Sequence, residues 1–419
     1  GYDDDESYES FALFINKLEN EKYGERSNRV CYLATPPTVF VSVCERINKY
    51  LKVKESKSWM RVIIEKPFGK DLESSNKLNS DISNFLSEDQ VYRIDHYLAK
   101  EMVQNIIVFR FANVIWDTIW NRKYVRCVKI SMKESAALDG RGGYYDEYGV
   151  IRDVLQNHLF QVLCLIAMEQ PCSLKSEDVR DEKVKVLKCI KPMDENKTII
   201  GQYSKSTDGK KPGYRDDPSI KNSDNPNSNQ ITYVQTILFV DNHRWANVPF
   251  ICKCGKGLDA KNTEIRIQFK NDGLCLFPDA NFNEIVMRLQ PNEAIWTKVN
   301  TKTPGFSRFD QAQAFELDIT YKNRFGPLKL PAAYTRLILD SLEGDQSLFV
   351  RSDELREAWR IVTPFLHKLA RENKDPPKYP RGSRGPPQAD KMAEEYGFRR
   401  SGHYKWQPTP KMSFKKGNL

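Results

Sequence analysis

Residues 93–100, RIDHYLAK, gather the residue types that proton transfer and anion binding require. Imidazole and carboxylate groups exchange protons near neutral pH, and ammonium and hydroxyl groups bind phosphate oxygens. A solvated charged loop is the alternative. Such a loop has no need of a His beside an Asp, just before the apolar run VQNIIVFRFANVIW. We therefore predict a functional role for this octapeptide.

A second candidate is His158, in the segment 149–163, GVIRDVLQNHLFQVL. Apolar residues recur there at the spacing of a helix that faces a core, namely Ile151, Val154, Leu155, Leu159 and Val162. His158 falls on the same face of the predicted helix. A lone His on an apolar face is commonly a core residue, so the helix by itself leaves both interpretations open.

The third candidate, Lys66, follows a short apolar strand predicted at 62–64. The sequence EKPFG places this Lys and Pro67 in the loop at the carboxyl end of the strand, which is where open α/β sheets bind their ligands. A surface Lys after a strand is the alternative interpretation.

The secondary structure that must position these residues is predicted to differ before and after residue 100. Helices at 7–20 and 39–51 alternate with strands at 29–34 and 62–64, a pattern typical of a parallel sheet. After residue 100, helices near 150–170 precede several strand-like stretches, which favour an α+β domain with a broad antiparallel sheet. These stretches begin at residues 231, 249, 263, 283 and 315.

Composition narrows the classes of function. The chain has 419 residues, of which 40% are hydrophobic, enough for two domains with ample cores. Its net charge of +9 arises from basic residues interleaved with acidic ones. This favours a mixed surface with cations for small phosphorylated ligands, and no nucleic-acid partner is expected. No apolar run approaches the roughly 20 residues of a membrane span, so no membrane partner is expected either.

The nine cysteines are odd in number and mostly lie in apolar segments. This usage is typical of a reduced, cytoplasmic protein. Cys252 and Cys254 lie in a predicted strand without nearby His or Cys partners, so we expect no metal site there.

Together, EKPFG at 65–69, RIDHYLAK at 93–100 and RDVLQNHL at 152–159 resemble motifs of the glucose-6-phosphate dehydrogenase family, in the same order and at similar separations. Further segments resemble the same family: GRGGYYDEYG at 140–149, DVRDEKVKVLKCI at 178–190, LQPNEAIWTK at 289–298, FVRSDELREAWRI at 349–361 and GSRGP at 382–386. The resemblance implies oxidation of glucose 6-phosphate to 6-phosphoglucono-1,5-lactone with NADP, the first step of the oxidative pentose phosphate pathway.

This resemblance also implies roles for individual residues. His158 matches the family's catalytic base, and Asp95 matches the carboxylate that orients it. The matches to phosphate-binding residues are His96, Tyr97 and Lys100. The matches to coenzyme-binding residues are Phe40 and Lys66, of which Lys66 also contacts the sugar. The matches to residues that bind or enclose the sugar are Glu134, Asp153, Lys256 and Gln290.

One departure from the family lies inside RIDHYLAK, where Ala99 replaces the usual Gly. A positive φ at this position would cost an Ala about 1 kcal/mol. Either the backbone is ordinary here or the loop is slightly strained.

In many eukaryotic relatives a second NADP binds away from the active site. The matches to its ligands are Arg266, Arg288, Arg384 and Trp406, with Trp296 at a position where the family has an aromatic residue. Arg side chains bind phosphates and an indole stacks on flat rings, so these residue types suit a nucleotide. Asn262 and Lys253 stand where basic residues, the second an Arg, are common. The alternative is that Trp406 packs into a core formed by the basic tail itself.

The family's glycine-rich phosphate-binding turn has no counterpart, because no G-x-x-G-x-x pattern follows a predicted strand. We therefore expect a chain that lacks the first βαβ unit, as a fragment, a partial sequence or a short isoform. The expected fold class is α/β plus α+β. A remnant of a Rossmann-like NADP-binding domain would span 1–95, and a substrate-binding and oligomerisation domain with a broad antiparallel sheet and packed helices would span 96–419.

Two roles remain open for such a chain. One is a cytoplasmic dehydrogenase that assembles as a homodimer or homotetramer. The other is a catalytically silent subunit that joins full-length enzyme as a structural or regulatory partner.

Overall fold

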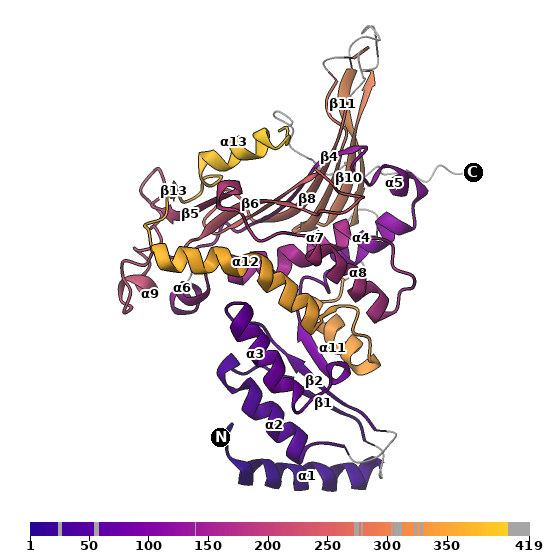
Figure 1. Ribbon diagram of the computed structural model, residues 1–419, viewed down its shortest axis with the longest axis vertical. Coiled ribbons are helices and arrows are strands. Elements are labelled where there is room, and N and C mark those ends of the chain that lie inside the picture. The colour runs from indigo at the N-terminus through magenta and orange to yellow at the C-terminus, as the bar shows by residue number, and fades with distance from the viewer. Residues whose placement is uncertain are drawn as a thin grey trace, which may run out of the picture. The chain divides into compact units, whose positions relative to one another are not determined.

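The computed structural model describes residues 1–23, 27–53, 58–138, 140–271, 276–277, 280–302, 305, 312–321, 325–326 and 330–400. The chain forms two compact units, each built from separate stretches of sequence (Figure 1). Unit 1 comprises residues 1–107, 151–194 and 331–374, and unit 2 comprises 108–150, 195–330 and 375–419. This division differs from the predicted boundary at residue 95, because two helical stretches from later in the chain belong to the N-terminal unit.

Unit 1 is built around a four-stranded sheet in the order β1-β2-β3-β12. Its strands are β1 (Arg29–Leu33), β2 (Met60–Ile64), β3 (Val91–Ile94) and β12 (Phe349–Val350). The two predicted strands, β1 and β2, are parallel as expected, the unpredicted β3 is parallel to β2, and β12 is antiparallel to β3. Apolar side chains of the strands pack with Leu337 and Ala99 into one buried cluster, which fixes the loop after β3 to the sheet.

The helices of unit 1 are α1 (Asp5–Tyr23), α2 (Phe40–Tyr50), α3 (Leu72–Ser83), α7 (Phe160–Ala167), α8 (Ser176–Lys188), α11 (Ala333–Glu343) and α12 (Ser352–Glu372), with short turns η1 (Pro37–Val39) and η2 (Glu88–Gln90). The helices α1 and α2 confirm the predictions at 7–20 and 39–51. Helix α12 packs against both α3 and α8. Helix α4 (Glu101–Phe111) runs across the boundary between the units.

The segment predicted as one helix at 149–163 is helical but not uniformly α. Residues Ile151–Leu159 form a π-helix, here η3, which continues directly into α7. Preceding it, Gly149 has a φ of 65°, and the side chain of Gln230 occupies the space that a Cβ would need. A Gly is therefore required at this break. The predicted core face is buried, including His158 at 4% exposure.

Unit 2 contains a nine-stranded sheet in the order β11-β10-β9-β8-β4-β7-β6-β5-β13. Its strands are β4 (Val125–Lys133), β5 (Thr198–Ser204), β6 (Tyr233–Phe239), β7 (Pro249–Gly255), β8 (Asn262–Phe269), β9 (Glu284–Gln290), β10 (Ala294–Lys302), β11 (Ala312–Thr320) and β13 (Lys378–Pro380). Neighbouring strands are antiparallel except for β4–β7 and β5–β13. The predicted broad, largely antiparallel sheet is thus present.

Among the described residues of unit 2, the remaining elements are short: α5 (Val114–Ile119), α6 (Gly142–Val150), α9 (Pro218–Lys221), α13 (Pro387–Glu395) and the turn η4 (Glu195–Lys197). Ala393 of α13 and the nearby Phe398 pack on Cys127, Ile237 and Ile251 of the sheet. The C-terminal helix is therefore part of the core of unit 2.

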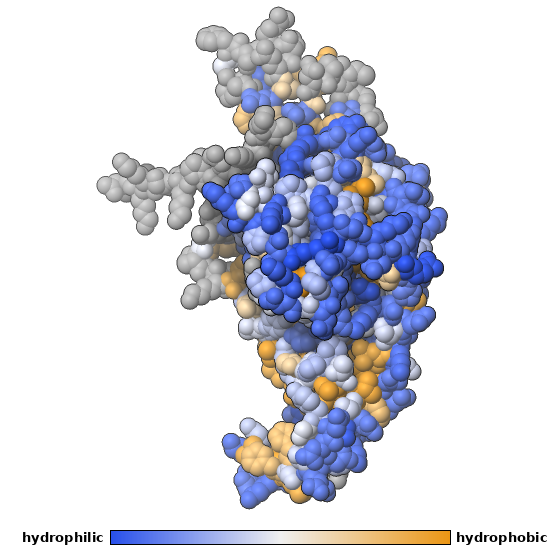
Figure 2. Space-filling model, turned by 90° about the vertical axis from the view of Figure 1, so that its left-hand side faces the viewer, coloured by the Kyte–Doolittle hydropathy of each residue, from blue (hydrophilic) through white to orange (hydrophobic). Residues whose placement is uncertain are grey.

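One helical stretch, Gly142–Ala167, is long and apolar enough to cross a membrane by length and composition, although the sequence showed no such run. In the fold, 83% of its apolar window is buried, which is typical of a core helix. The face of the molecule drawn in Figure 2 is mainly hydrophilic, and hydrophobic colour is most frequent in the lower third of the view. Exposed apolar residues of α1 include Phe11, Leu13 and Phe14.

Candidate active site

The end of strand β3 positions the first candidate side chains. Asp95 directly follows the strand and is 2% exposed. Its Oδ1 accepts a hydrogen bond of 2.9 Å from the backbone N–H of Tyr97, and its carbonyl accepts one from Leu98. These bonds hold the turn that carries His96 and Tyr97, so the octapeptide is an ordered structure at the carboxyl edge of the parallel sheet.

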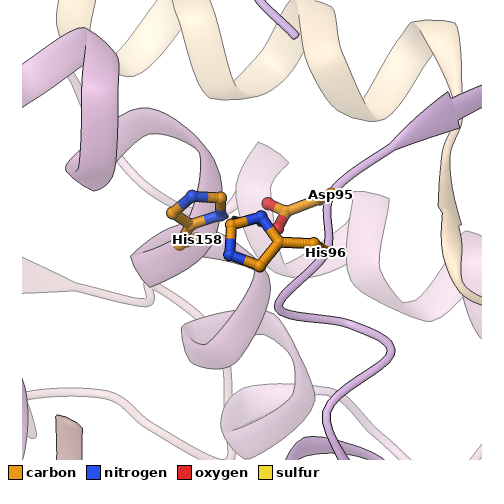
Figure 3. Close-up of side chains that lie close together, drawn as sticks. All are labelled: Asp95, His96 and His158. Carbon is orange, nitrogen blue, oxygen red and sulfur yellow. Dashed lines mark hydrogen bonds and ion pairs between the residues drawn. The ribbon is translucent and has the colours of Figure 1, made fainter. Parts of the chain in front are cut away.

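His158 of η3 lies against Asp95, with 2.6 Å between Nδ1 and Oδ1 (Figure 3). Burial alone would raise the pKa of Asp95, but the adjoining His158 holds that pKa at about 2. Burial lowers the pKa of His158, opposed by Asp95 and assisted by the charge of Lys66. At neutral pH the carboxylate is therefore ionised and the imidazole neutral. Its Nδ1–H donates to Asp95, and Nε2 keeps a lone pair.

Lys66 lies in the loop after β2 and is the third member of the group formed with Asp95 and His158. Its Nζ lies 3.2 Å from Nε2 of His158 and donates to the carbonyl of Asp153 at 2.9 Å. It also contacts Oδ1 of Asp153 at 3.3 Å. Asp153 and His158 are five residues apart on the π-helix, whose hydrogen bonds join residues at that spacing. The π-helix thus presents both to one ammonium group.

The three residues predicted to bind phosphate lie together beside this group. The rings of His96 and Tyr97 lie 4.7 and 4.5 Å from that of His158, and Nζ of Lys100 lies 4.9 Å from the ring of Tyr97. Burial, with help from the cationic neighbours, lowers the pKa of His96 to about 4. The smaller contribution comes from Lys66 and Lys100, whose positive charges a bound anion would balance.

The structure resolves the question of Ala99, because its φ is not positive and its backbone is ordinary. Ala99 is buried in the core cluster of unit 1. A residue that the sequence analysis missed is Tyr334 of α11, whose ring lies 6.1 Å from that of His96 and nearly parallel to it. No local motif marks Tyr334, which is more than 200 residues away along the chain.

Asp95, His96 and His158 also have the residue types of a metal site, with ligand atoms within 4.8 Å of one another. The ammonium group of Lys66, 3.2 Å from Nε2 of His158, opposes a cation at that nitrogen. The arrangement suits proton transfer better than metal binding.

The predicted sugar-binding residues of unit 2 lie at one end of its sheet. Glu134 follows β4 and Lys256 follows β7, and these parallel strands pair Lys133 with Gly255. The Lys256 ammonium is hydrogen-bonded to the Glu134 carboxylate. Gln290, the last residue of β9, pairs with Thr263 near the start of β8, which places it at the same end. The sheet thus brings together three residues that are far apart in sequence.

Phe40, a predicted coenzyme contact, is 1% exposed at the start of α2. Its side chain contributes to the core of unit 1, so only backbone atoms here are available to a ligand.

The residues matched to a second nucleotide site cluster on one face of the nine-stranded sheet. Arg266 of β8 forms ion pairs with Glu264 and Glu284, and Arg288 of β9 pairs with Glu264. The guanidinium of Arg288 also lies 5.2 Å from the ring centre of Trp296. Trp406 lies outside the described residues.

Two lysines add to the positive charge of this surface, and one of them, Lys129, was not predicted. Lys129 of β4 is buried against the ring of Phe398, and burial and the charge of Lys253 lower its pKa to about 7. Burial likewise lowers the pKa of Lys253 to about 8, and its Nζ donates to the carbonyl of Arg384 at 2.8 Å. Arg384 itself pairs with Asp390. This surface holds more positive charge than the carboxylate of Asp390 balances.

Family models match nearly the whole chain. A family model described as "Glucose-6-phosphate dehydrogenase, NAD binding domain" matches residues 1–105, and one described as "Glucose-6-phosphate dehydrogenase, C-terminal domain" matches residues 107–407. The expectation that the coenzyme-binding unit is lacking is not supported, because the first model matches here.

Individual relatives carry the same name. Glucose-6-phosphate 1-dehydrogenase of Takifugu rubripes is 50% identical, over 91% of this chain and 71% of the relative. That of Dictyostelium discoideum is 46% identical, over 97% of this chain and 80% of the relative. A solved structure, "Glucose-6-phosphate dehydrogenase in complex with its substrate glucose-6-phosphate", superposes with a TM-score of 0.90 at 42% identity, covering 96% of this chain and 81% of that one.

Proposed function

The chain belongs to the glucose-6-phosphate dehydrogenase family, and from this premise we propose that it oxidises D-glucose 6-phosphate to 6-phosphoglucono-1,5-lactone while NADP is reduced to NADPH. The observation that carries the proposal is the buried pair of His158 and Asp95 beside Lys66. This pair provides a neutral imidazole with an oriented lone pair, which the reaction needs.

Oxidation at C1 of the sugar removes a proton from the hydroxyl and a hydride from the carbon. Nε2 of His158 accepts the proton, and Asp95 stabilises the imidazolium that results. Lys66 stabilises negative charge that develops on the C1 oxygen during this transfer. NADP, when bound, supplies the acceptor for the hydride, and Lys66 together with the backbone near Phe40 would contact it.

Binding of the phosphate is proposed for His96, Tyr97 and Lys100, whose ring and ammonium groups lie in one cluster. The sugar hydroxyls are proposed to be held by Asp153 from unit 1. The proposed partners from unit 2 are Glu134, Lys256 and Gln290.

The experiment that tests this function measures NADPH formation by the purified protein with glucose 6-phosphate. A second candidate function is a catalytically silent subunit that assembles with full-length enzyme. Turnover of glucose 6-phosphate would exclude the silent subunit. Absence of turnover, with co-purification of full-length enzyme, would favour it.

We also propose a second NADP site on the sheet of unit 2, formed by Arg266, Arg288 and Arg384, with Trp406 from the tail. Lys129 and Lys253 support it, because buried cations with lowered pKa values gain most from a bound phosphate. NADP should therefore raise the melting temperature, by an amount equivalent to about 2.7 kcal/mol at a hundredfold excess over Kd.

Proton uptake provides a sharper test of this second site. At pH 8, Lys129 with a pKa near 7 is mostly neutral, and a bound phosphate would raise that pKa, so binding should take up protons from the buffer. Affinity should accordingly weaken as pH rises above about 7, the pKa of Lys129 in the free protein. Calorimetric titration in two buffers of different ionisation enthalpy measures the uptake. Lys129→Met should abolish most of it, whereas Arg384→Ala should weaken binding and retain the uptake. Equal enthalpies in both buffers would contradict this assignment.

Assembly as a homodimer or homotetramer is proposed through the edge of the nine-stranded sheet. Strand β11 exposes Phe315, Leu317 and Ile319 on one face, at 41%, 66% and 45%. Adjacent exposed apolar side chains on an edge strand are typical of an interface. Analytical ultracentrifugation that found only monomer at micromolar concentration would contradict it. The eight described cysteines are free, which supports a cytoplasmic location.

A further inference from the structure

A small cavity lies within unit 1, and Asp95 forms part of its wall. Its lining includes Asp95, Gln156, Gln161, Glu354, Ala358 and Trp359. Its volume is about 30 Å³ for the centres of water-sized molecules. About 10–15 Å³ measured in this way holds one water, so the cavity has room for one or two.

Two carboxylates line the cavity, and in each of them only one of the two oxygens accepts a hydrogen bond from the described residues. Oδ1 of Asp95 accepts from His158 and from the N–H of Tyr97. Oε1 of Glu354 accepts from Lys183 at 3.0 Å and from Gln161 at 2.5 Å. Within the described part of the chain, Oδ2 of Asp95 and Oε2 of Glu354 are buried and have no hydrogen-bond partner. Buried carboxylate oxygens require donors, and the cavity is where such donors fit.

Glu354 is itself rigidly held. Glu354 and Lys183 are both 0% exposed, and Nζ of Lys183 also donates to Oε1 of Gln161 at 3.0 Å. One turn later on α12, the indole N–H of Trp359 donates to the carbonyl of Phe68, in the loop that carries Lys66. Helix α12 therefore contacts both the loop that carries Lys66 and the buried network of Lys183 and Gln161. Neither substrate binding nor proton transfer, as proposed above, requires this network.

We propose that ordered water in this cavity donates to Oδ2 of Asp95 and Oε2 of Glu354 together, which makes Glu354 a positioning residue for the pair of Asp95 and His158. A water molecule has two protons and matches two acceptors. With Oδ2 held in this way, the carboxylate cannot rotate out of line with Nδ1 of His158. Lys183 and Gln161 fix Glu354, so the chain of contacts runs from the buried ion pair to the base.

The test fills the cavity without touching the ion pair. Ala358 lines the cavity one helical turn after Glu354 and is 5% exposed. Ala358→Val should displace water and lower kcat roughly tenfold, less than the 10²-fold that a misplacement of 1 Å can cost. KM for glucose 6-phosphate should stay within about twofold, because the phosphate site is untouched.

Ala358→Thr is the matched control, since it has the same shape as Ala358→Val but adds a hydroxyl that can donate in place of water. It should retain clearly more activity than Ala358→Val. Equal kcat losses in both variants would mean a packing effect and would overturn the proposal, as would wild-type kcat in Ala358→Val. A loss confined to KM would overturn it too.

A second pair of substitutions guards against a variant that fails to fold. Glu354→Gln with Lys183→Met removes both charges and avoids an unpaired buried Lys. The double variant should show the same fall in kcat at unchanged KM, with Gln346→Met as a control for loss of a buried polar side chain that does not line the cavity. Wild-type kcat in the folded double variant would overturn the proposal. The inference rests on the proposed dehydrogenase activity. Absence of turnover in the wild-type protein would count against that activity. Wild-type kcat in Ala358→Val or in the double variant would instead count against the role of Glu354.

Discussion

Replacement of His158 by Asn is expected to lower kcat by about 10²- to 10⁴-fold while glucose 6-phosphate still binds. The Asn side chain keeps polarity and approximate size but cannot accept the hydroxyl proton. Steady-state kinetics of NADPH formation would measure the loss, and binding of the sugar phosphate in the absence of turnover would show that the site is intact.

The control for this prediction is Asp95→Asn, which should give a smaller loss of the same kind. That substitution leaves the base in place but removes the charge that orients it. Because burial lowers the pKa of His158, wild-type kcat should fall only on the acidic side of the usual His range near 6.5, as the imidazole becomes protonated. A kcat close to the wild-type value in His158→Asn would contradict the role as base and would mean that His158 is a core residue.

Replacement of Lys100 by Ala is expected to reduce activity towards glucose 6-phosphate much more than activity towards free glucose. Its ammonium group belongs to the cluster proposed to bind the phosphate, so kcat/KM for glucose 6-phosphate should fall by roughly 10²- to 10³-fold. Turnover of free glucose, which has no phosphate, should be slow from the outset and should change by less than about threefold.

Matched controls are available for this experiment. Lys100→Arg keeps the charge and should recover part of the activity towards glucose 6-phosphate, because a guanidinium also binds phosphate. Lys77→Ala, on the exposed side of α3, should leave both substrates unaffected. Equal losses on glucose and glucose 6-phosphate in Lys100→Ala would contradict the proposed phosphate site.

Local pattern predicted the first two parallel strands of unit 1 and much of the large sheet, because apolar runs bounded by turns were long enough to identify. Strands β3, β5, β12 and β13 were not predicted, and neither were β4 and β10. Lys129 and Lys298 are buried within them, at 8% and 5% exposure, whereas their charge indicates a solvent-facing position. Tertiary partners account for this: Lys129 lies over Phe398, and Lys298 pairs with Glu284. Such partners are not visible in a single stretch of sequence.

The catalytic group was predicted in its residues but not in its geometry. The motifs identified Asp95, His158 and Lys66, yet the contact between Lys66 and His158 depends on a π-helix where the spacing of apolar residues predicted an α-helix. Both helices bury the same apolar positions in this segment, so hydrophobic periodicity does not distinguish them. Glu354 lies about 200 residues after His158 and carries no local signal of its contact with the site.

The π-helix also determines which changes of length the segment can tolerate. In an α-helix, residues three or four apart share a face, and residues five apart do not. Deletion of one residue between Asp153 and His158 would put them four apart, and a relaxed α-helix would again bring both to Lys66. Insertion of one residue would place them six apart, on different sides of either helix. After a deletion here, a change from π-helix to α-helix is therefore expected to restore the contacts of both residues with Lys66. After an insertion, neither helix type restores them.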